Sequence, residues 1–358
     1  MMDEWLWMCS MPGFYRNDFA RLLQFFESPE AIRKSEKKQI SLLPFLKDRQ
    51  KKVLEEWRSH SAEEIRHKLT EKGIKFISCM EKGYPERLRA LEDYPYGLFY
   101  LGELPSPRER CVAVVGARMC TNYGRSIAVE VAEVLSEHGI SIVSGMAYGI
   151  DGIAQAACLK AGGRSYAVTG CGADICYPAD HRSLCRELAQ KGGVITEYPP
   201  GTQPVPLHFP MRNRLISGLS ECVIVVEAKK KSGSLITADL ALDQGKDVLA
   251  VPGRMEDPLS EGCNQLISQG AGILTSVEEL ISHLGISMEN VKKKKKNNIT
   301  LASSENMVYI CLDFRPKSLT EIIRSSGLPA EAVMRILMDL QMRGLVEEIS
   351  KNYYVLKK

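Results

Sequence analysis

One segment of six residues, 209–214, combines side chains that could bind a phosphate-containing ligand. Its members are Phe209, Pro210, Met211, Arg212, Asn213 and Arg214. An aromatic ring stacks on a nucleobase and guanidinium groups neutralise phosphates, so this composition is typical of single-stranded nucleic-acid sites. In the structural alternative, Phe209 fills the core and the arginines cap helices or form surface ion pairs. The elements that position this segment must decide between the two interpretations.

The composition is that of an ordinary globular protein. The chain has 358 residues, of which 44% are hydrophobic and 25% charged, and this length allows two or three domains. The net charge of +3 is too small to indicate a nucleic-acid partner, so that interpretation depends on local clustering. No basic signal-peptide region precedes the eleven cysteines, and no apolar run approaches the roughly 20 residues that span a bilayer.

We therefore expect a cytoplasmic protein with reduced thiols and no membrane span. The closest cysteines, Cys171 and Cys176, have no second pair or nearby histidine to complete a zinc site, so we expect no bound metal.

Six short apolar runs predict strands that are buried on both faces. They lie at 112–115, 140–143, 165–168, 193–196, 222–226 and 248–251. Helical patterns separate most of them, at 124–138, 151–160 and 234–244. Strands that alternate with helices in this way predict an α/β fold, a Rossmann-like doubly wound parallel sheet over residues 108–285.

The flanking segments have different patterns. Residues 1–85 show amphipathic helical runs and predict a small helical domain that loosely resembles sterile-alpha-motif or helix-hairpin-helix folds. Residues 86–107 are rich in proline and predict a connector. Residues 286–304 contain five consecutive lysines, Lys292 to Lys296, and predict a solvated linker.

The last segment, 305–358, predicts three helices followed by a hairpin, as in a winged helix. Residues 330–343 would form its recognition helix. Eight basic residues against seven acidic ones give this segment a balance of +1. Both a DNA-reading wing and an accessory or protein-binding wing remain open.

In a doubly wound sheet, ligands bind beyond the carboxyl ends of the strands. The loops at these ends are rich in glycine, which lets a backbone approach an anion, and they lead into helix N-termini. Cations also gather there: Arg118, Arg212, Arg214, Lys229, Lys230, Lys231 and Arg254. We therefore predict a basic rim on this edge, and we expect Asp151 to cap the helix that follows the second strand.

A dinucleotide site is the obvious rival interpretation of this edge. Residues 116–118 lack the third glycine of the G-x-G-x-x-G fingerprint, and the chain has no G-x-x-x-x-G-K-[ST] phosphate loop. The two histidines near the edge, His181 and His208, form no recognisable nucleophile or acid-base arrangement. We therefore expect no cofactor.

A series of short motifs resembles the DNA-processing protein A family, also called DprA or Smf. In chain order they are residues 116–118, 144–145, 149–151, 177–178, 197–199, 209–214, 232–238, 251–253 and 262–267. The resemblance implies a non-enzymatic cytoplasmic protein that binds single-stranded DNA and protects incoming DNA during natural transformation. It also implies loading of a RecA-type recombinase and a homodimer formed through the sheet domain.

The edge and the resemblance together predict a DNA-binding set. It comprises Gly116, Arg118, Gly145, Tyr148, Gly149, Phe209, Arg212, Asn213, Arg214, Lys229, Ser232, Gly233 and Ser234. Within it we expect Phe209 to stack on a base and Arg212 to contact phosphate. Asn213 and Arg214 could equally be internal braces, since buried polar side chains usually serve backbone partners.

The chain departs from the family pattern at three positions. Tyr148 stands where a basic residue is usual, Gln155 replaces a histidine, and Cys263 lies where a hydroxyl residue is common. The change at 148 puts one phosphate contact in doubt, although a tyrosine could stack on a base.

Two alternative functions remain. The sheet domain is also similar to nucleoside-monophosphate phosphoribohydrolases, but residues 232–237 lack the glutamate of their P-G-G-x-G-T-x-x-E signature. The winged-helix-like segment suggests a transcriptional regulator. The low net charge of this segment argues against that function.

Overall fold

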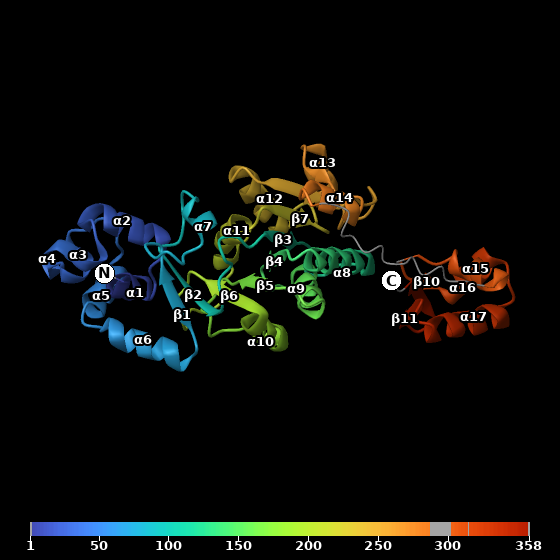
Figure 1. The fold of residues 1–358 in the computed structure, drawn as a ribbon, viewed down its shortest axis with the longest axis horizontal. Coiled ribbons are helices and arrows are strands. Elements are labelled where there is room, and N and C mark those ends of the chain that lie inside the picture. Colours follow the sequence, from blue (N-terminus) through green and yellow to red (C-terminus); the bar gives the residue numbers. More distant parts are fainter. Residues whose placement is uncertain (1, 287–301, 314, 357–358) are drawn as a thin grey trace. The chain divides into compact units, whose positions relative to one another are not determined.

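The computed structural model describes residues 2–286, 302–313 and 315–356 (Figure 1). The chain forms two compact units, one with the N-terminal helices and the large sheet and one with the C-terminal domain. Most of the lysine-rich linker expected at 286–304 lies outside the described residues.

The larger unit is built on one nine-stranded sheet with the order β1-β2-β6-β5-β4-β3-β7-β8-β9. Its parallel strands are β3 (Cys111–Val115), β4 (Ser141–Ser144), β5 (Ser165–Val168), β6 (Gly192–Thr196), β7 (Cys222–Val225), β8 (Asp247–Ala250) and β9 (Gly272–Ile273). The six apolar runs of the sequence thus form β3 to β8. The predicted fold class, a Rossmann-like doubly wound sheet, is confirmed.

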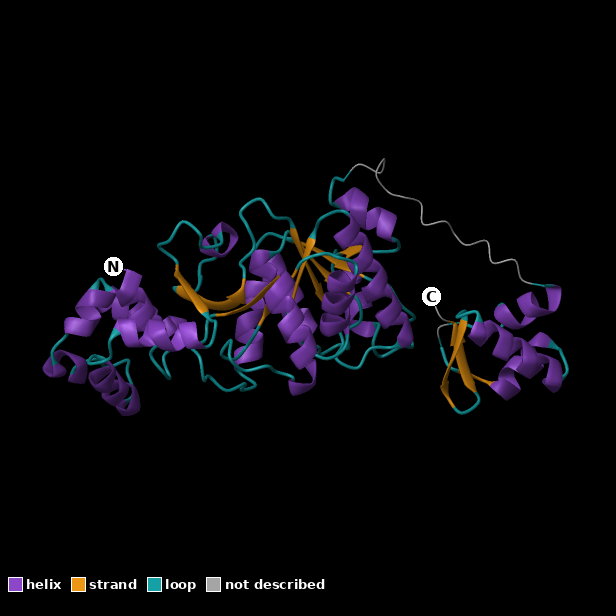
Figure 2. Ribbon diagram, turned by 60° about the horizontal axis from the view of Figure 1, so that its bottom comes forward, coloured by secondary structure: helices purple, strands orange, loops and turns teal. Residues whose placement is uncertain are grey.

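Helices cover both faces of this sheet. They are α7 (Glu86–Arg89), α8 (Asn122–Glu137), α9 (Ile150–Lys160), α10 (Arg182–Lys191), α11 (His208–Leu219), α12 (Gly233–Asp243), α13 (Glu261–Ser268) and α14 (Val277–His283). Helices α9 and α10 pack together on one face, and α11 and α12 pack together on the other (Figure 1). Figure 2 shows the strands in the middle of the domain with helices packed against them. Burial on both faces explains why these strands are apolar throughout.

Two antiparallel strands extend the sheet beyond β6. Strand β1 (Lys75–Ser78) lies within the segment expected to be helical, and β2 (Gly97–Gly102) lies within the expected connector. Strand β2 pairs with β6, and β1 pairs with β2. Buried Ile77, Leu98 and Phe99 stabilise this addition. The expected boundaries at 85 and 107 do not separate these strands, because Pro95 and Pro105 flank β2 and obscure its pattern, and β1 is only four residues long.

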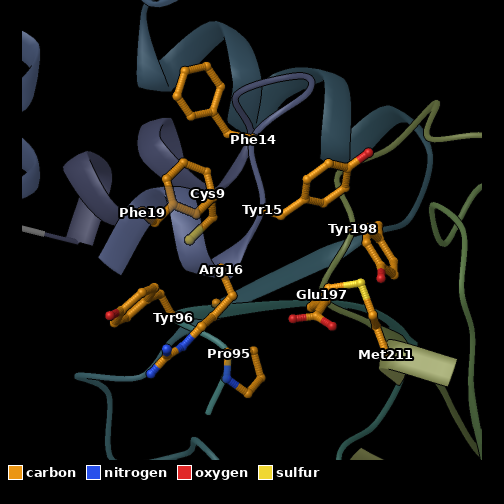
Figure 3. A pocket seen from close by; sticks show the side chains of 11 residues that line it. Cys9, Phe14, Tyr15, Arg16, Phe19, Pro95, Tyr96, Glu197, Tyr198 and Met211 are labelled. Carbon is orange, nitrogen blue, oxygen red and sulfur yellow. The ribbon is translucent and has the colours of Figure 1, made fainter. Parts of the chain in front are cut away.

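The N-terminal segment is helical up to residue 71. Its helices are α1 (Met2–Cys9), α2 (Arg16–Phe26), α3 (Pro29–Lys34), α4 (Lys37–Ser41), α5 (Asp48–Trp57) and α6 (Ala62–Glu71). The turn between α1 and α2 reaches the sheet (Figure 3). There the Arg16 guanidinium lies 5.6 Å from the ring centroid of Tyr96, and the rings of Tyr15 and Tyr198 meet edge to face at 6.2 Å.

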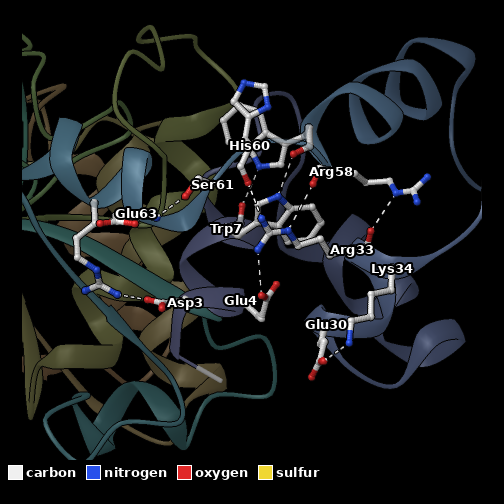
Figure 4. A network of polar contacts seen from close by, with 12 residues as sticks. Asp3, Glu4, Trp7, Glu30, Arg33, Lys34, Arg58, His60, Ser61 and Glu63 are labelled. Carbon is white, nitrogen blue, oxygen red and sulfur yellow. Dashed lines mark hydrogen bonds and ion pairs between the residues drawn. The ribbon is translucent and has the colours of Figure 1, made fainter.

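A polar network ties the ends of these helices together (Figure 4). The indole nitrogens of Trp7 and Trp57 each donate to the other residue's carbonyl, at 3.0 and 2.9 Å. Arg33 donates to Glu4 at 3.0 Å and to the carbonyl of His60 at 2.8 Å. These long-range bonds fix short helices that would be marginal alone.

The C-terminal domain has the predicted winged-helix fold. It contains α15 (Ser303–Tyr309), α16 (Leu319–Ser326), α17 (Ala330–Met342) and a sheet of β10 (Lys317–Ser318), β12 (Tyr353–Leu356) and β11 (Val346–Ser350). Ser318 and Glu321 form a reciprocal capping box at the start of α16. Val308, Ile336 and Tyr354 belong to its separate core.

Candidate nucleic-acid site

A pocket of about 490 Å³ lies beyond the carboxyl ends of β3 and β7. These strands are neighbours, although the chain runs through β4, β5 and β6 between them, so the direction of winding reverses here. This is the topological switch point at which doubly wound sheets bind ligands. The loop after β3 forms one wall, the loop after β7 another, and α11 the floor.

The pocket brings together most of the predicted DNA-binding residues. Those that line it are Gly116, Arg118, Phe209, Arg212, Asn213, Lys229, Ser232, Gly233 and Ser234. Four predicted residues, Gly145, Tyr148, Gly149 and Arg214, do not line it. Met119 and Tyr177 also line the pocket, although neither belongs to the predicted DNA-binding set.

Arg212 contributes to the floor as a buried cation, with only 5% of its surface exposed. Its Nη1 donates to the carbonyl of Gly145 at 3.2 Å, and its Nε donates to Oδ1 of Asn213 at 3.3 Å. Burial lowers the pKa of Arg212 to about 10, a change that the Asp151 carboxylate opposes. The side chain therefore stays charged at neutral pH, fixed by its neighbours while it lines the pocket.

Gly145 and Gly149 make room for this arrangement rather than contacting the pocket. A Cβ at Gly145 would lie 2.6 Å from Nη2 of Arg212. At Gly149, φ is +73° and a Cβ would lie 2.1 Å from the carbonyl oxygen of Ala117. Gly145 is required because the Arg212 guanidinium and the Asp151 carboxylate occupy the space of a side chain, and Gly149 because the loops after β3 and β4 approach closely.

The expectation that Asp151 caps α9 is wrong. Gly149 occupies the N-cap position, and Asp151 lies inside the first turn. Its buried carboxylate accepts a hydrogen bond from the amide of Gly145 at 3.1 Å. Burial raises the pKa of Asp151, and the charge of Arg212 opposes that rise. Asp151 thus serves as the electrostatic partner of Arg212.

Arg214 points into the protein, away from the pocket. It pairs with Glu197 at 2.7 Å and with Asp93 at 2.8 Å, and only 6% of the residue is exposed. Two positions along a helix correspond to a rotation of about 200°, so Arg214 faces away from Arg212. We therefore withdraw Arg214 as a ligand contact and assign it as an internal brace.

Asn213 combines a bracing role with a place in the wall of the pocket. Its Nδ2 donates to the carbonyl of Gly233 at 3.2 Å, which joins α11 to the first residue of α12. Ser232 caps α12 by accepting from the amide of Ser234.

Tyr148 is exposed but lies outside the pocket. Its hydroxyl donates to Oδ2 of Asp180 at 2.6 Å, and its ring meets that of His181 at 5.2 Å. The other two departures from the family pattern are internal. Gln155 donates to the carbonyl of Tyr166 at 3.1 Å, and buried Cys263 contacts the carbonyl of Val225. None of the three therefore changes the lining of the pocket.

An aromatic ledge forms one side of the pocket. The rings of Phe209 and Tyr177 lie 5.3 Å apart at 34°. Tyr177 belongs to the Tyr177-Pro178 motif, which the sequence offered as a family feature without a role. A ledge of this kind suits the stacking of an unpaired base.

The rim carries exposed cations: Arg118, Lys229 and Lys231. Among the described residues, none of the three pairs with a carboxylate. Their charges remain available to an anionic ligand, in contrast to the buried arginines of α11.

The start and the end of α11 are held by distant segments. At the start, Nδ1 of His208 donates to the carbonyl of Gly170 at 3.0 Å, so its Nε2 accepts from the hydroxyl of Tyr15 at 3.2 Å. Burial lowers the pKa of His208, which favours this neutral form. At the end, Nζ of Lys246 donates to three carbonyls of the last turn, those of Ser217, Gly218 and Ser220.

Comparison with known proteins identifies the family. The model of the family described as DNA recombination-mediator protein A matches residues 75–285, more than half of the chain. The chain belongs to this family. A model of the DprA winged-helix domain matches residues 292–350.

Individual members of the DprA family support this assignment. The chain is 36% identical over 284 residues to Protein Smf of Escherichia coli, which covers 77% of this chain and 75% of that protein. The crystal structure of DprA from Streptococcus pneumoniae matches with a TM-score of 0.65 and 33% identity, over 79% of this chain and 98% of that one. A structure of DNA processing protein A from Helicobacter pylori matches with a TM-score of 0.53 and 30% identity, over 60% and 97% of the two chains. That work concerns the single-stranded DNA binding mode of the Helicobacter protein.

None of the helices in the described part of the chain has the length and apolar character needed to cross a membrane.

Proposed function

We propose that this protein binds single-stranded DNA in the pocket at the switch point and acts as a recombination mediator without enzymatic activity. The observation that carries the proposal is the pairing of exposed, unpaired cations with an aromatic ledge in one pocket. Arg118, Lys229 and Lys231 would neutralise phosphates, while Phe209 and Tyr177 would stack with bases. Arg212 would supply positive potential from the floor and hold the shape of the pocket.

Family membership supports the proposed mediator role. We propose that the bound strand is protected and passed to a RecA-type recombinase in the cytoplasm during natural transformation. The description of the family as a recombination mediator and the DNA-binding Helicobacter relative support this.

We further propose a homodimer formed through the sheet domain. Strand β9 is one of the two edge strands of the large sheet, and Ile273 on it is 51% exposed. An uncovered apolar edge strand suits pairing with a second copy.

The enzyme alternative finds little support at the pocket. Asp151 is the one carboxylic acid among the lining residues. Its carboxylate interacts electrostatically with Arg212 and accepts a hydrogen bond from the amide of Gly145. A general acid or base must reach the substrate, and this carboxylate is buried.

The regulator alternative is disfavoured by the surface of α17. Met334, Met338 and Met342 lie one turn apart on this helix and are 47%, 65% and 82% exposed. Base edges in a major groove are recognised mainly by hydrogen-bonding side chains, which methionine lacks. We therefore assign the C-terminal domain an accessory role.

Fluorescence anisotropy with labelled single-stranded and duplex DNA tests the proposal. We expect single strands to bind more tightly, with an affinity that falls steeply as salt increases. Arg118→Ala and Lys229→Ala should each weaken binding to any sequence by about tenfold. Lys160→Ala is the matched control, because this exposed lysine is the last residue of α9 and lies on the side of the sheet where the strands begin, away from the pocket.

Equal binding by the wild type and both pocket variants would exclude the pocket. A separate assay of recombinase assembly on single strands coated with a single-strand-binding protein tests the mediator role. No acceleration by the wild-type protein would reject that role while leaving DNA binding intact.

A further inference from the structure

A second hollow, of about 480 Å³, adjoins the pocket on the far side of the loop after β7. The two hollows share part of their walls: Lys231, Ser232, Gly233 and Ile236 line both. The residues that line only the second hollow are Lys230, Leu235, Asp239, Gly262, Gln265, Leu266 and Gln269. The two hollows are therefore adjacent, with residues 231–233 as the ridge between them.

The ridge is suited to an extended chain of phosphates. Gly233 is the first residue of α12, so its amide has no hydrogen-bond acceptor within the helix. This amide also lies at the positive end of the helix dipole. No atom lies within 4 Å of where a Cβ at Gly233 would stand, so the space above this backbone is open. Lys231 is the first residue of the ridge and is exposed.

The second hollow has chemistry that fits a nucleotide. Lys230 supplies an exposed positive charge. Gln265 on α13 (Glu261–Ser268) and Gln269 at its C-cap, four residues later, supply amide groups that can hydrogen-bond to a base edge. Leu235 and Leu266 give the hollow an apolar side. Its volume, like that of the first pocket, falls in the range of small-molecule sites.

We propose that the DNA strand continues from the first pocket over the ridge at 231–233 and places its next nucleotide in the second hollow. This rests on the proposed function, because the first pocket must bind single-stranded DNA. Asp239 repels phosphate, so the backbone follows Lys230 and Lys231 while the base lies toward Asp239 and Gln265. The protein then binds a longer stretch of the DNA strand than the first pocket alone can hold.

The three consecutive lysines after β7 allow a matched test. Lys229 lines only the first pocket, Lys230 only the second hollow, and Lys231 both. The test measures affinity for oligothymidylates of about four to about sixteen nucleotides. It compares the wild type with Lys229→Ala, Lys230→Ala and the control Lys160→Ala. Lys229→Ala should weaken binding at every length. Lys230→Ala should weaken binding several-fold for long strands only, and should make the slope of log affinity against log salt less negative by about 0.7.

Two neutral changes separate a shaped site from general attraction. Gln265→Ala with Gln269→Ala should also weaken the binding of long strands alone, although no charge is lost. Asp239→Asn should strengthen it, because a carboxylate beside the strand is removed.

The inference is overturned if Lys230→Ala binds every length as the wild type does, or if Lys160→Ala loses as much affinity as Lys230→Ala. In either case the effect of Lys229→Ala on short strands would still uphold the first pocket. Failure of the proposed function looks different, because Lys229→Ala and Arg118→Ala would then leave binding unchanged at every length.

Discussion

The floor and the rim of the pocket use the same kind of residue for opposite purposes. Arg212 and Arg214 of α11 are both buried and matched with carboxylates. Arg212 lines the floor and is matched with Asp151, whereas Arg214 points away from the pocket and pairs with Glu197 and Asp93. On the rim, Arg118 and the lysines after β7 are exposed, and none of them forms an ion pair with a carboxylate among the described residues. A buried cation requires an internal partner, whereas an exposed one remains available to a ligand. The comparison separates cations that hold the fold from cations that we propose to bind DNA.

The largest expected effect is on stability, at Arg214. Arg214→Ala leaves the buried carboxylate of Glu197 without its cation, and should lower the free energy of unfolding by about 3–5 kcal/mol. Guanidinium denaturation measures this. Arg118→Ala, on the rim, should change stability by no more than about 0.5 kcal/mol. A loss below about 1 kcal/mol at Arg214 would remove the distinction between the buried, paired arginines of α11 and the exposed cations of the rim.

Arg212 should behave as a floor residue with a smaller effect. Arg212→Met should cost about 2–4 kcal/mol of unfolding free energy, because Asp151 loses its counter-charge. Asp151→Asn in the same chain should restore part of this loss, since the uncompensated charge is then absent. A double-mutant cycle measures the coupling, and strictly additive losses would contradict the pairing.

The rim should show the reverse pattern. Lys229→Ala combined with Lys231→Ala should weaken single-strand binding by about tenfold to a hundredfold, as expected when two charge-assisted contacts are lost. The same protein should unfold at the wild-type denaturant concentration. Anisotropy and denaturation on one preparation test both statements, and a large stability loss would show that these lysines also hold the fold.

The smallest effects concern the start of α11. Tyr15→Phe removes the hydroxyl that His208 accepts from, and should cost about 0.5–1.5 kcal/mol. Burial lowers the pKa of His208 below its ordinary value of 6.5. Below pH 6.5, His208 therefore binds a proton more readily in the unfolded chain than in the folded protein. The free energy of unfolding should therefore fall as the pH decreases below about 6.5, and His208 should have little influence above it.

Denaturation of wild type and His208→Gln at about pH 5.5 and pH 7.5 measures this contribution. The wild type should lose more stability than the variant on acidification. The same pH dependence in both proteins would show that His208 is not responsible.

Local patterns in the sequence determined most of the architecture. The six apolar runs became β3 to β8, and the glycine-rich loops fell at one edge, because side-chain periodicity and buried parallel strands are short-range features. The motif series identified the family. The ledge residue Tyr177 was visible as part of a motif, but nothing in the local pattern placed it against Phe209.

Only the tertiary structure decided which cations are buried and paired and which are exposed at the pocket. Arg212 and Arg214 are two residues apart, and the rotation of α11 together with the positions of Asp151, Asp93 and Glu197 assigns their partners. The strands β1 and β2, the contact between Tyr15 and His208, and the second hollow beside α13 also join segments far apart in the chain. The energy of such contacts depends on burial and on partners that no single stretch of sequence contains. The sequence therefore indicated the side of the sheet on which the pocket forms, and packing determined which of its charges are buried and which are exposed.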